Sequence, residues 1–171
     1  MKKIAIDTYY RSEQEAYTVG IIFEEWDDKK PLSIVDDVNE TFDRYIPGEF
    51  YKRELPCILR ILNKINILEF DSIILDGYID LKDNEGNIKP GLGRRLCSKI
   101  NIHDDLDIIG IAKSLYCRTD EISYKLVRNS SKALYCQSLR GNSLDFLKYL
   151  DGDYRIPTLL KLLDNKTKGI G

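Results

Sequence analysis

The sequence predicts an α/β protein in which helices flank a mixed β-sheet. Short apolar and β-branched runs typical of strands come first, and helical spacing of apolar residues begins only after Pro47. Two later apolar runs, at 73–75 and 106–111, are typical of buried central strands. The resulting order is strands, helix, strand, helix, strand, hairpin and two helices. This order indicates a mixed sheet with helices on its faces.

Three strands are expected before the first helix. Ile4 and Ile6 share one face of a short first strand, which leaves Asp7 near its C-terminal end. Residues 17–23 and 32–35 follow as strands, because they are rich in β-branched and aromatic side chains. The polar stretches between these strands are typical of hairpin connections in an antiparallel meander.

The first helix is expected to carry a carboxylate at its start. Apolar residues at helical spacing run from Ile58 to Ile65. Pro56 suits the first helical position, where a missing N–H costs nothing. Glu54 then lies just before the helix or in its first turn.

The remaining elements follow from turn residues and periodicity. They are a loop at 80–90, a helix at 92–100, a hairpin formed by 122–127 and 133–137, and helices at 143–150 and from Pro157 onward.

Composition indicates one globular domain spanning residues 1–171. No apolar run reaches the length of a membrane span, and the N-terminus leads directly into a strand. We therefore expect a cytoplasmic monomer with no membrane partner. The net charge of −2 argues against a protein that coats nucleic acid indiscriminately, but it permits an enzyme that makes few phosphate contacts. Four cysteines without C-x-x-C spacing and a single histidine argue against a zinc ribbon or finger.

Three carboxylates occupy positions where a sheet edge and a helix start can bring them together. Asp7 and Asp76 each follow a predicted strand, and acids at the ends of central strands meet at one edge of such a sheet. Glu54 joins them if its helix packs across the same end. Carboxylates held by separate elements are what a hard divalent cation requires. Each acid alone has a simpler explanation, as a turn former or as a charge at a helix start.

An aromatic residue stands next to a rigid turn just before the predicted helix. Tyr45 precedes Ile46-Pro47-Gly48, and an aromatic held on a fixed loop can replace a stacked base. The alternative is that Tyr45 is an ordinary packing aromatic.

The order and spacing of these segments resemble the endonuclease V family, which has a ribonuclease H-like fold, over about Ile4 to Asp164. The most specific match is Tyr45-Ile46-Pro47-Gly48 followed by Arg53-Glu54-Leu55-Pro56. Weaker matches are Ala5-Ile6-Asp7-Thr8-Tyr9-Tyr10, Leu75-Asp76-Gly77 and Ile109-Gly110-Ile111-Ala112-Lys113.

The resemblance implies a metal-dependent endonuclease that cleaves nucleic acid 3′ of a deaminated purine, inosine or deoxyinosine, in DNA repair or RNA processing. Its partner would be DNA or RNA, single-stranded or lesion-bearing. Asp7, Glu54 and Asp76 would hold Mg²⁺ or Mn²⁺, and Lys113 would lie near the scissile phosphate. Tyr45 would fill the gap left by an extruded base. The implied substrate-binding residues are Tyr45, Pro47, Gly48, Gly77, Gly110, Ala112, Arg95 and Arg140.

The chain departs from the family pattern at several positions. Ile79 replaces a glycine of the family, and Arg95 and Arg140 stand where the resemblance leads us to expect histidines. Asp145 is either a fourth metal ligand or an acid in the first turn of a helix. Two alternatives therefore stay open: a catalytically impaired nucleic-acid-binding module of the same fold, and a nuclease with another lesion preference.

Overall fold

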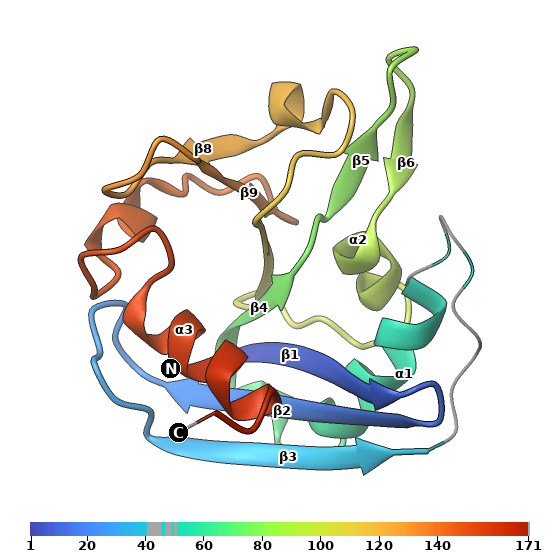
Figure 1. Ribbon diagram of the computed structural model, residues 1–171, viewed down its shortest axis with the longest axis vertical. Helices are drawn as coiled ribbons and strands as arrows, with labels where there is room; N and C mark the ends of the chain where they lie inside the picture. Colours follow the sequence, from blue (N-terminus) through green and yellow to red (C-terminus); the bar gives the residue numbers. More distant parts are fainter. Residues whose placement is uncertain (41–45, 47–48, 50, 171) are drawn as a thin grey trace.

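The computed structural model describes residues 1–40, 46, 49 and 51–170, and it is organised around a seven-stranded mixed sheet (Figure 1). The strands are β1 (Lys2–Ser12), β2 (Glu15–Phe23), β3 (Ser33–Asn39), β4 (Phe70–Asp76), β7 (Asp107–Ala112), β8 (Tyr124–Leu126) and β9 (Leu134–Ser138). They lie in the order β3-β2-β1-β4-β7-β9-β8. The central strands β1, β4 and β7 are parallel, and the outer pairings are antiparallel. The predicted α/β class with a mixed sheet is confirmed.

Strand β1 is longer than the sequence analysis expected. Pairing with β2 continues through Thr8, Tyr9 and Tyr10, so the strand ends at Ser12 rather than near Asp7. A long hairpin partner supplies ladder hydrogen bonds to polar residues that carry no strand signal of their own. Asp7 therefore lies within β1, although it stands level with the end of β4.

Two helical layers cover the two faces of the sheet. Helix α1 (Tyr51–Leu62) and helix α2 (Leu92–Cys97) cover one face, and helix α3 (Thr158–Thr167) covers the other (Figure 1). Alternation along β1 separates the two cores, because Ile4 and Ile6 pack with α1 whereas Ala5 packs on the α3 side. Helix α3 begins after Pro157, as predicted.

Helix α1 begins earlier than expected. It starts at Tyr51, so Pro56 lies inside the helix and not at its first position. The proline removes the N–H that would bond to the Lys52 carbonyl. The apolar face around Ile58 and Ile61 stays fully buried, which favours continuing the helix through this gap.

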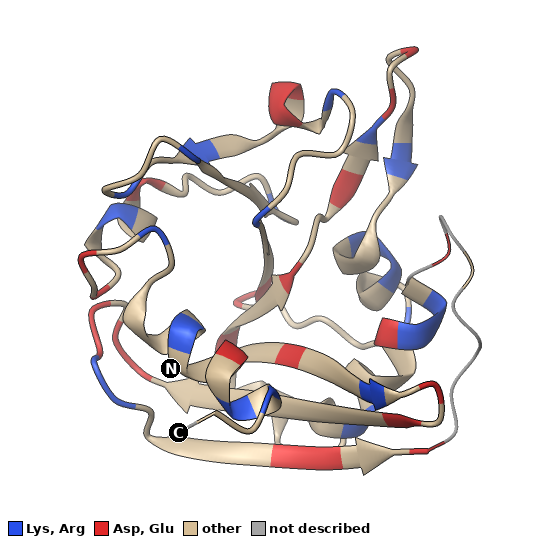
Figure 2. Ribbon diagram, viewed as in Figure 1, with Lys and Arg blue, Asp and Glu red and all other residues tan. Residues whose placement is uncertain are grey.

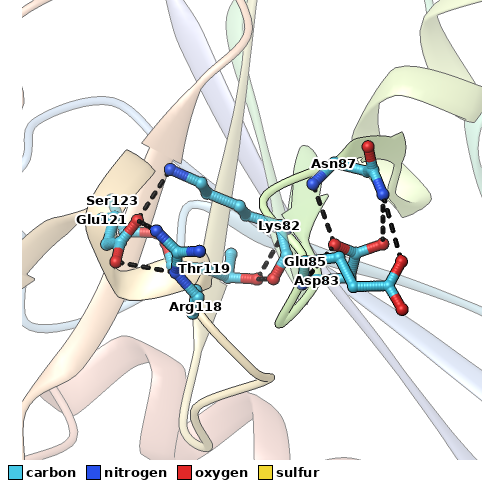
Figure 3. A network of polar contacts seen from close by, with 8 residues as sticks. All are labelled: Lys82, Asp83, Glu85, Asn87, Arg118, Thr119, Glu121 and Ser123. Atoms are coloured by element: carbon cyan, nitrogen blue, oxygen red, sulfur yellow. Dashed lines mark hydrogen bonds and ion pairs between the residues drawn. The ribbon is translucent and has the colours of Figure 1, made fainter.

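The segment 80–90 was expected to be a loop, and this expectation was wrong. Residues Asp80–Lys82 (β5) and Ile88–Pro90 (β6) form an antiparallel hairpin that projects from the sheet at the top of Figure 1. Figure 3 shows how the short helix η2 (Thr119–Ile122) contacts Lys82, the residue of β5 next to the turn of the hairpin. The Lys82 Nζ lies 2.7 Å from Glu121 Oε2, and the Lys82 N–H donates to Thr119 Oγ1 at 2.9 Å. These long-range contacts stabilise strands too short to be recognised from their sequence.

The other elements agree more closely with expectation. The late hairpin is formed by β8 and β9, whereas 143–150 contains only the 3₁₀ helix η3 (Asp145–Tyr149); another 3₁₀ turn, η1 (Ile67–Glu69), precedes β4. The four cysteines are free thiols, two of them buried. Within the described ranges, no helix has both the length and the apolar character needed to cross a membrane.

Candidate active site

The parallel register of the central strands brings two acids to one level of the sheet. Ile6 of β1 pairs with Leu75 of β4, so Asp7 lies beside Asp76. Asp76 in turn pairs with Ile111 of β7, which places Lys113 just beyond the end of that strand. The Lys113 Nζ lies 3.9 Å from Asp76 Oδ2. The expected meeting of acids at the carboxyl ends of the strands is thus observed for Asp7 and Asp76.

Glu54 approaches the same place from the first turn of α1. Its side chain is buried, and its charge interacts with those of Asp7 and Asp76. The nearby hydroxyls of Thr8 and Tyr10 on β1 act to lower its pKa. Asp7, Glu54 and Asp76 line a shared cavity of about 260 Å³.

A fourth carboxylate, Asp164 of α3, completes the cluster, and the sequence analysis missed it. Its Oδ1 lies 3.8 Å from Lys113 Nζ and 2.9 Å from Lys168 Nζ. Figure 2 shows acidic positions on β1, at the end of β4 and on α3, with basic positions on either side of the acid of α3. Helical spacing was the available signal, because Asp164 follows the inward-facing Leu160 by one turn.

The cluster contains carboxyl groups that hold protons unusually well. Burial, and then the charge of Asp76, raise the pKa of Asp7 to about 6. Burial, and then the charge of Asp7, raise the pKa of Glu54 to about 8. Burial also raises the pKa of Asp76, although Lys113 opposes it. At Asp164, burial acts in the same direction but is outweighed by Lys168 and Lys113, so its pKa is lowered.

These groups fit a hard divalent cation by chemistry. All are carboxylates, the donors that Mg²⁺ and Mn²⁺ prefer, and burial together with mutual repulsion raises the pKa values of Asp7 and Glu54, so a bound cation would relieve that repulsion. In the part of the chain that the structure describes, however, no three acidic, histidine or cysteine side chains are already arranged as a metal-binding group. The site thus has suitable donors that are not pre-arranged around an ion.

Small residues next to the acids allow a loop to lie on β7. A Cβ on Gly110 would stand 2.5 Å from the Gly77 carbonyl oxygen and 3.2 Å from the Ile79 nitrogen. Gly77 has a φ of +145°, a conformation that disfavours any side chain. Ala112 is buried near the end of β7. Gly110 is therefore needed for the close approach of the chain that follows Asp76.

The replacement of a glycine by Ile79 is accommodated inside the protein. The Ile79 side chain is 2% exposed and packs in the core on the α1 side, directly against Gly93. It is not among the described residues that line the cavity at Asp7.

Arg95 of α2 lies on the same face of the sheet as Glu54. Its guanidinium stacks on the Tyr51 ring at 3.6 Å, at the start of α1. Its Nε is buried and has no hydrogen-bond partner among the described residues. Leu92 of the same helix lines the carboxylate cavity. The structure therefore places Arg95 near this cavity.

Other candidates lie away from the acids or outside the described residues. Arg140 hydrogen-bonds the carbonyls of Leu106 and His103 at the start of β7, roughly 20 Å along that strand from Lys113. Asp145 is exposed in η3 and pairs with Lys148. The structure does not bring Arg140 or Asp145 to the cluster. The predicted roles of Tyr45, Pro47 and Gly48 fall outside the described residues.

Neither a protein-family model nor a curated protein sequence matches the chain. Solved structures do match. Endonuclease V of Ciona intestinalis, in complex with a 24mer DNA containing an inosine followed by a ribo-adenosine, has a TM-score of 0.72 at 15% identity and covers 98% of this chain and 84% of its own. Human endonuclease V has a TM-score of 0.65 at 16% identity, covering 98% and 83%. Endonuclease V of Bacillus subtilis has a TM-score of 0.62 at 18% identity, covering 98% and 78%.

These matches define the class of the fold. The chain has the ribonuclease H-like fold of the endonuclease V structures. The resemblance expected from the sequence is confirmed at this level.

Proposed function

We propose that this protein is a metal-dependent endonuclease that cleaves DNA or RNA 3′ of a deaminated purine. The observation that carries the proposal is the meeting of Asp7, Glu54, Asp76 and Asp164 with Lys113 at one edge of an endonuclease V-like sheet. The substrate class is supported by the matching Ciona structure, which contains inosine-bearing DNA.

Asp7, Glu54 and Asp76 would hold Mg²⁺ or Mn²⁺. When bound, such an ion polarises a phosphodiester and lowers the pKa of the attacking water. Glu54 and Asp7 would have to lose their protons for this, so the site would load more readily as the pH rises. Thr8 and Tyr10 would keep the Glu54 carboxylate oriented through their hydroxyls.

Lys113 would bind the scissile phosphate. Its side chain is 40% exposed, so its ammonium remains accessible beside Asp76. Asp164 would position this ammonium from the α3 side. Arg95 would contact a neighbouring phosphate, because a guanidinium already stacked on Tyr51 loses little freedom on binding. Gly77, Gly110 and Ala112 would border the base pocket, and Tyr45 would be the wedge.

Nucleic-acid binding without cleavage is the second candidate function. Among the described residues, no three side chains are already arranged to bind a metal, and this favours binding without cleavage. The arginine at position 95, where a histidine was expected, favours it as well. A cluster with raised pKa values would then stay partly protonated and would tolerate a nearby phosphate.

Cleavage of defined oligonucleotides separates these functions. DNA and RNA strands carrying a single inosine are incubated with the protein and Mg²⁺ or Mn²⁺, beside strands carrying uracil, an abasic site or a mismatch. We expect a single nick 3′ of inosine, lost in Asp76→Asn and retained in Asp145→Asn, whose carboxylate lies outside the cluster. Inosine-dependent binding with no nick, unchanged in Asp76→Asn, would support the binding module. Preferential cleavage of another lesion would assign a different specificity.

A further inference from the structure

A second, larger groove lies on the other side of α3 from the acids. It has a volume of about 770 Å³, and its walls are the segment 152–156, helix α3 and the loop between β8 and β9. Thr158, Lys161, Leu162 and Asn165 of α3 line it, whereas Leu160 and Leu163 face the cavity beside Asp7 and Asp76. One helix therefore separates the groove from the candidate active site.

An exposed aromatic ring stands in this groove on a firmly held backbone. The Tyr154 side chain is 80% exposed. Its own carbonyl accepts a hydrogen bond from Arg128 Nε at 3.1 Å, and Arg128 also donates to the Gly152 carbonyl. The Asn129 amide donates to the Asp153 carbonyl at 2.6 Å. The backbone that carries Tyr154 is thus held at three successive carbonyls, so an exposed ring could stack on a base with little loss of backbone freedom.

The charges along the groove favour an anionic ligand. Lys161 is 59% exposed and stands at the boundary with the active site, 3.6 Å from Asp164. Arg155 also lines the groove, and no acidic side chain is among its described lining residues. Lys132 and Lys166 lie exposed nearby on the same two walls. Tyr154 and Lys161 line the same groove, and proteins bind single-stranded nucleic acid by combining aromatic rings for its bases with basic side chains for its phosphates.

We infer that this groove binds an unpaired nucleotide that flanks the cleavage site, with its base on Tyr154 and its phosphate on Lys161. The inference rests on the proposed function, because a strand that passes the acids and crosses α3 at Lys161 enters the groove directly. The groove then fixes the path of the substrate strand without reading the deaminated base.

Binding is measured by fluorescence anisotropy with labelled single-stranded oligodeoxyadenylate and oligoadenylate of 20 nucleotides, without inosine and without divalent metal. Tyr154→Ala is expected to weaken binding about 5- to 150-fold, the range for loss of one stacked base. Tyr154→Trp should keep wild-type affinity within about twofold, because it preserves a π-face. Lys161→Gln should reduce the slope of log K against log salt by about 0.7, corresponding to one phosphate contact.

Tyr149→Ala is the matched control, because Tyr149 is 73% exposed and lies outside the described lining of the groove. Its affinity should equal that of the wild type. Two results would overturn the inference, because each would show only a general attraction of anions. One is wild-type affinity in Tyr154→Ala. The other is full displacement of the oligonucleotide by polyglutamate, to the same extent in the wild type and in Tyr154→Ala. The outcome is independent of catalysis, since a protein that never cleaves inosine strands can still show binding that depends on Tyr154.

Discussion

Lys113 and Asp164 face each other across the edge of the sheet, with Nζ 3.8 Å from Oδ1. The same ammonium lies 3.9 Å from Asp76, so it joins an acid of β4 to an acid of α3. Lysines keep the pKa of Asp164 low, whereas burial raises those of Asp7 and Glu54. The cluster therefore combines one carboxyl group whose pKa is lowered by neighbouring lysines with two whose pKa values are raised by burial.

Asp164→Asn should reduce cleavage of an inosine-containing strand by roughly 10- to 100-fold, the usual cost of losing a group that orients a site residue. The amide keeps the shape of the side chain but removes the charge that holds Lys113. Single-turnover rates at saturating protein measure this effect. Asp145→Asn, an equally small change on an exposed 3₁₀ helix, should leave the rate unchanged. Equal rates in Asp164→Asn and the wild type would exclude Asp164 from the site.

The metal-free protein should lose stability as the pH rises from about 4 to 8. The folded-state pKa values of Asp7, about 6, and Glu54, about 8, exceed their ordinary values of 3.8 and 4.5. Between these limits the folded protein binds more protons than the unfolded chain, so the free energy of unfolding falls with increasing pH. This stabilisation is fully present below about pH 4 and is lost as the pH passes the folded-state values. Urea unfolding of the metal-free protein across this range measures the trend.

Glu54→Gln tests which group dominates this trend. The neutral amide should raise the free energy of unfolding at pH 8 relative to the wild type, and should give no gain at pH 4. Glu25→Gln, at an exposed position, should change neither value. Mn²⁺ should stabilise the wild type more at pH 8 than at pH 5, because the ligands must be deprotonated. Wild-type stability that rises steadily from pH 4 to pH 8 would contradict the assignment.

The sequence predicted the parts of the site that strands and turns determine locally. Asp7 and Asp76 follow apolar runs whose parallel pairing brings them together, and this needed only the alternation pattern and the fold class. Helical spacing places Asp164 on the same face of α3 as Leu160, but local periodicity does not say which end of the sheet that face packs against. The hairpin β5–β6 was missed because its pairing depends on contacts with η2, far along the chain. Tertiary packing likewise overrode the proline signal in α1.

Gly110→Ala should destabilise the protein by about 1–3 kcal/mol. The added methyl would stand 2.5 Å from the Gly77 carbonyl oxygen. A Cβ is fixed by its own backbone and the carbonyl is part of the backbone, so neither can rotate away. The loop that follows Asp76 would be displaced. The cleavage rate should therefore fall by more than the increase in the unfolded fraction at 25 °C can account for. Chemical denaturation and single-turnover rates measure both quantities. Ala112→Gly, two residues along β7, removes a methyl without a clash and should preserve the loop. Normal cleavage and stability in Gly110→Ala would show that the loop can shift freely.

Arg155→Ala should lower the free energy of unfolding by about 2 kcal/mol or more, and should lower the cleavage rate further. Arg155 donates to the carbonyls of Lys113, Lys132 and Ala133, at 3.1 Å and 2.9 Å for the last two. One guanidinium thus ties the segment that leads into α3 to the chain that carries Lys113. Its loss leaves three carbonyls without their charged donor. Because Lys113 and Asp164 lie on the two segments joined, the maximal rate should fall more than the apparent affinity for substrate.

A lysine at position 155 separates positioning from simple stability. Arg155→Lys keeps the charge but lacks the planar guanidinium that bonds all three carbonyls. Relative to Arg155→Ala, it should recover part of the free energy of unfolding but little of the cleavage rate. Arg60→Ala provides the matched control, because Arg60 pairs with Asp37 on the surface and is 47% exposed. Losing that exposed pair should cost no more than about 1 kcal/mol and leave cleavage intact. If Arg155→Ala loses stability but cleaves at the wild-type rate at low temperature, Arg155 is structural and does not position Lys113.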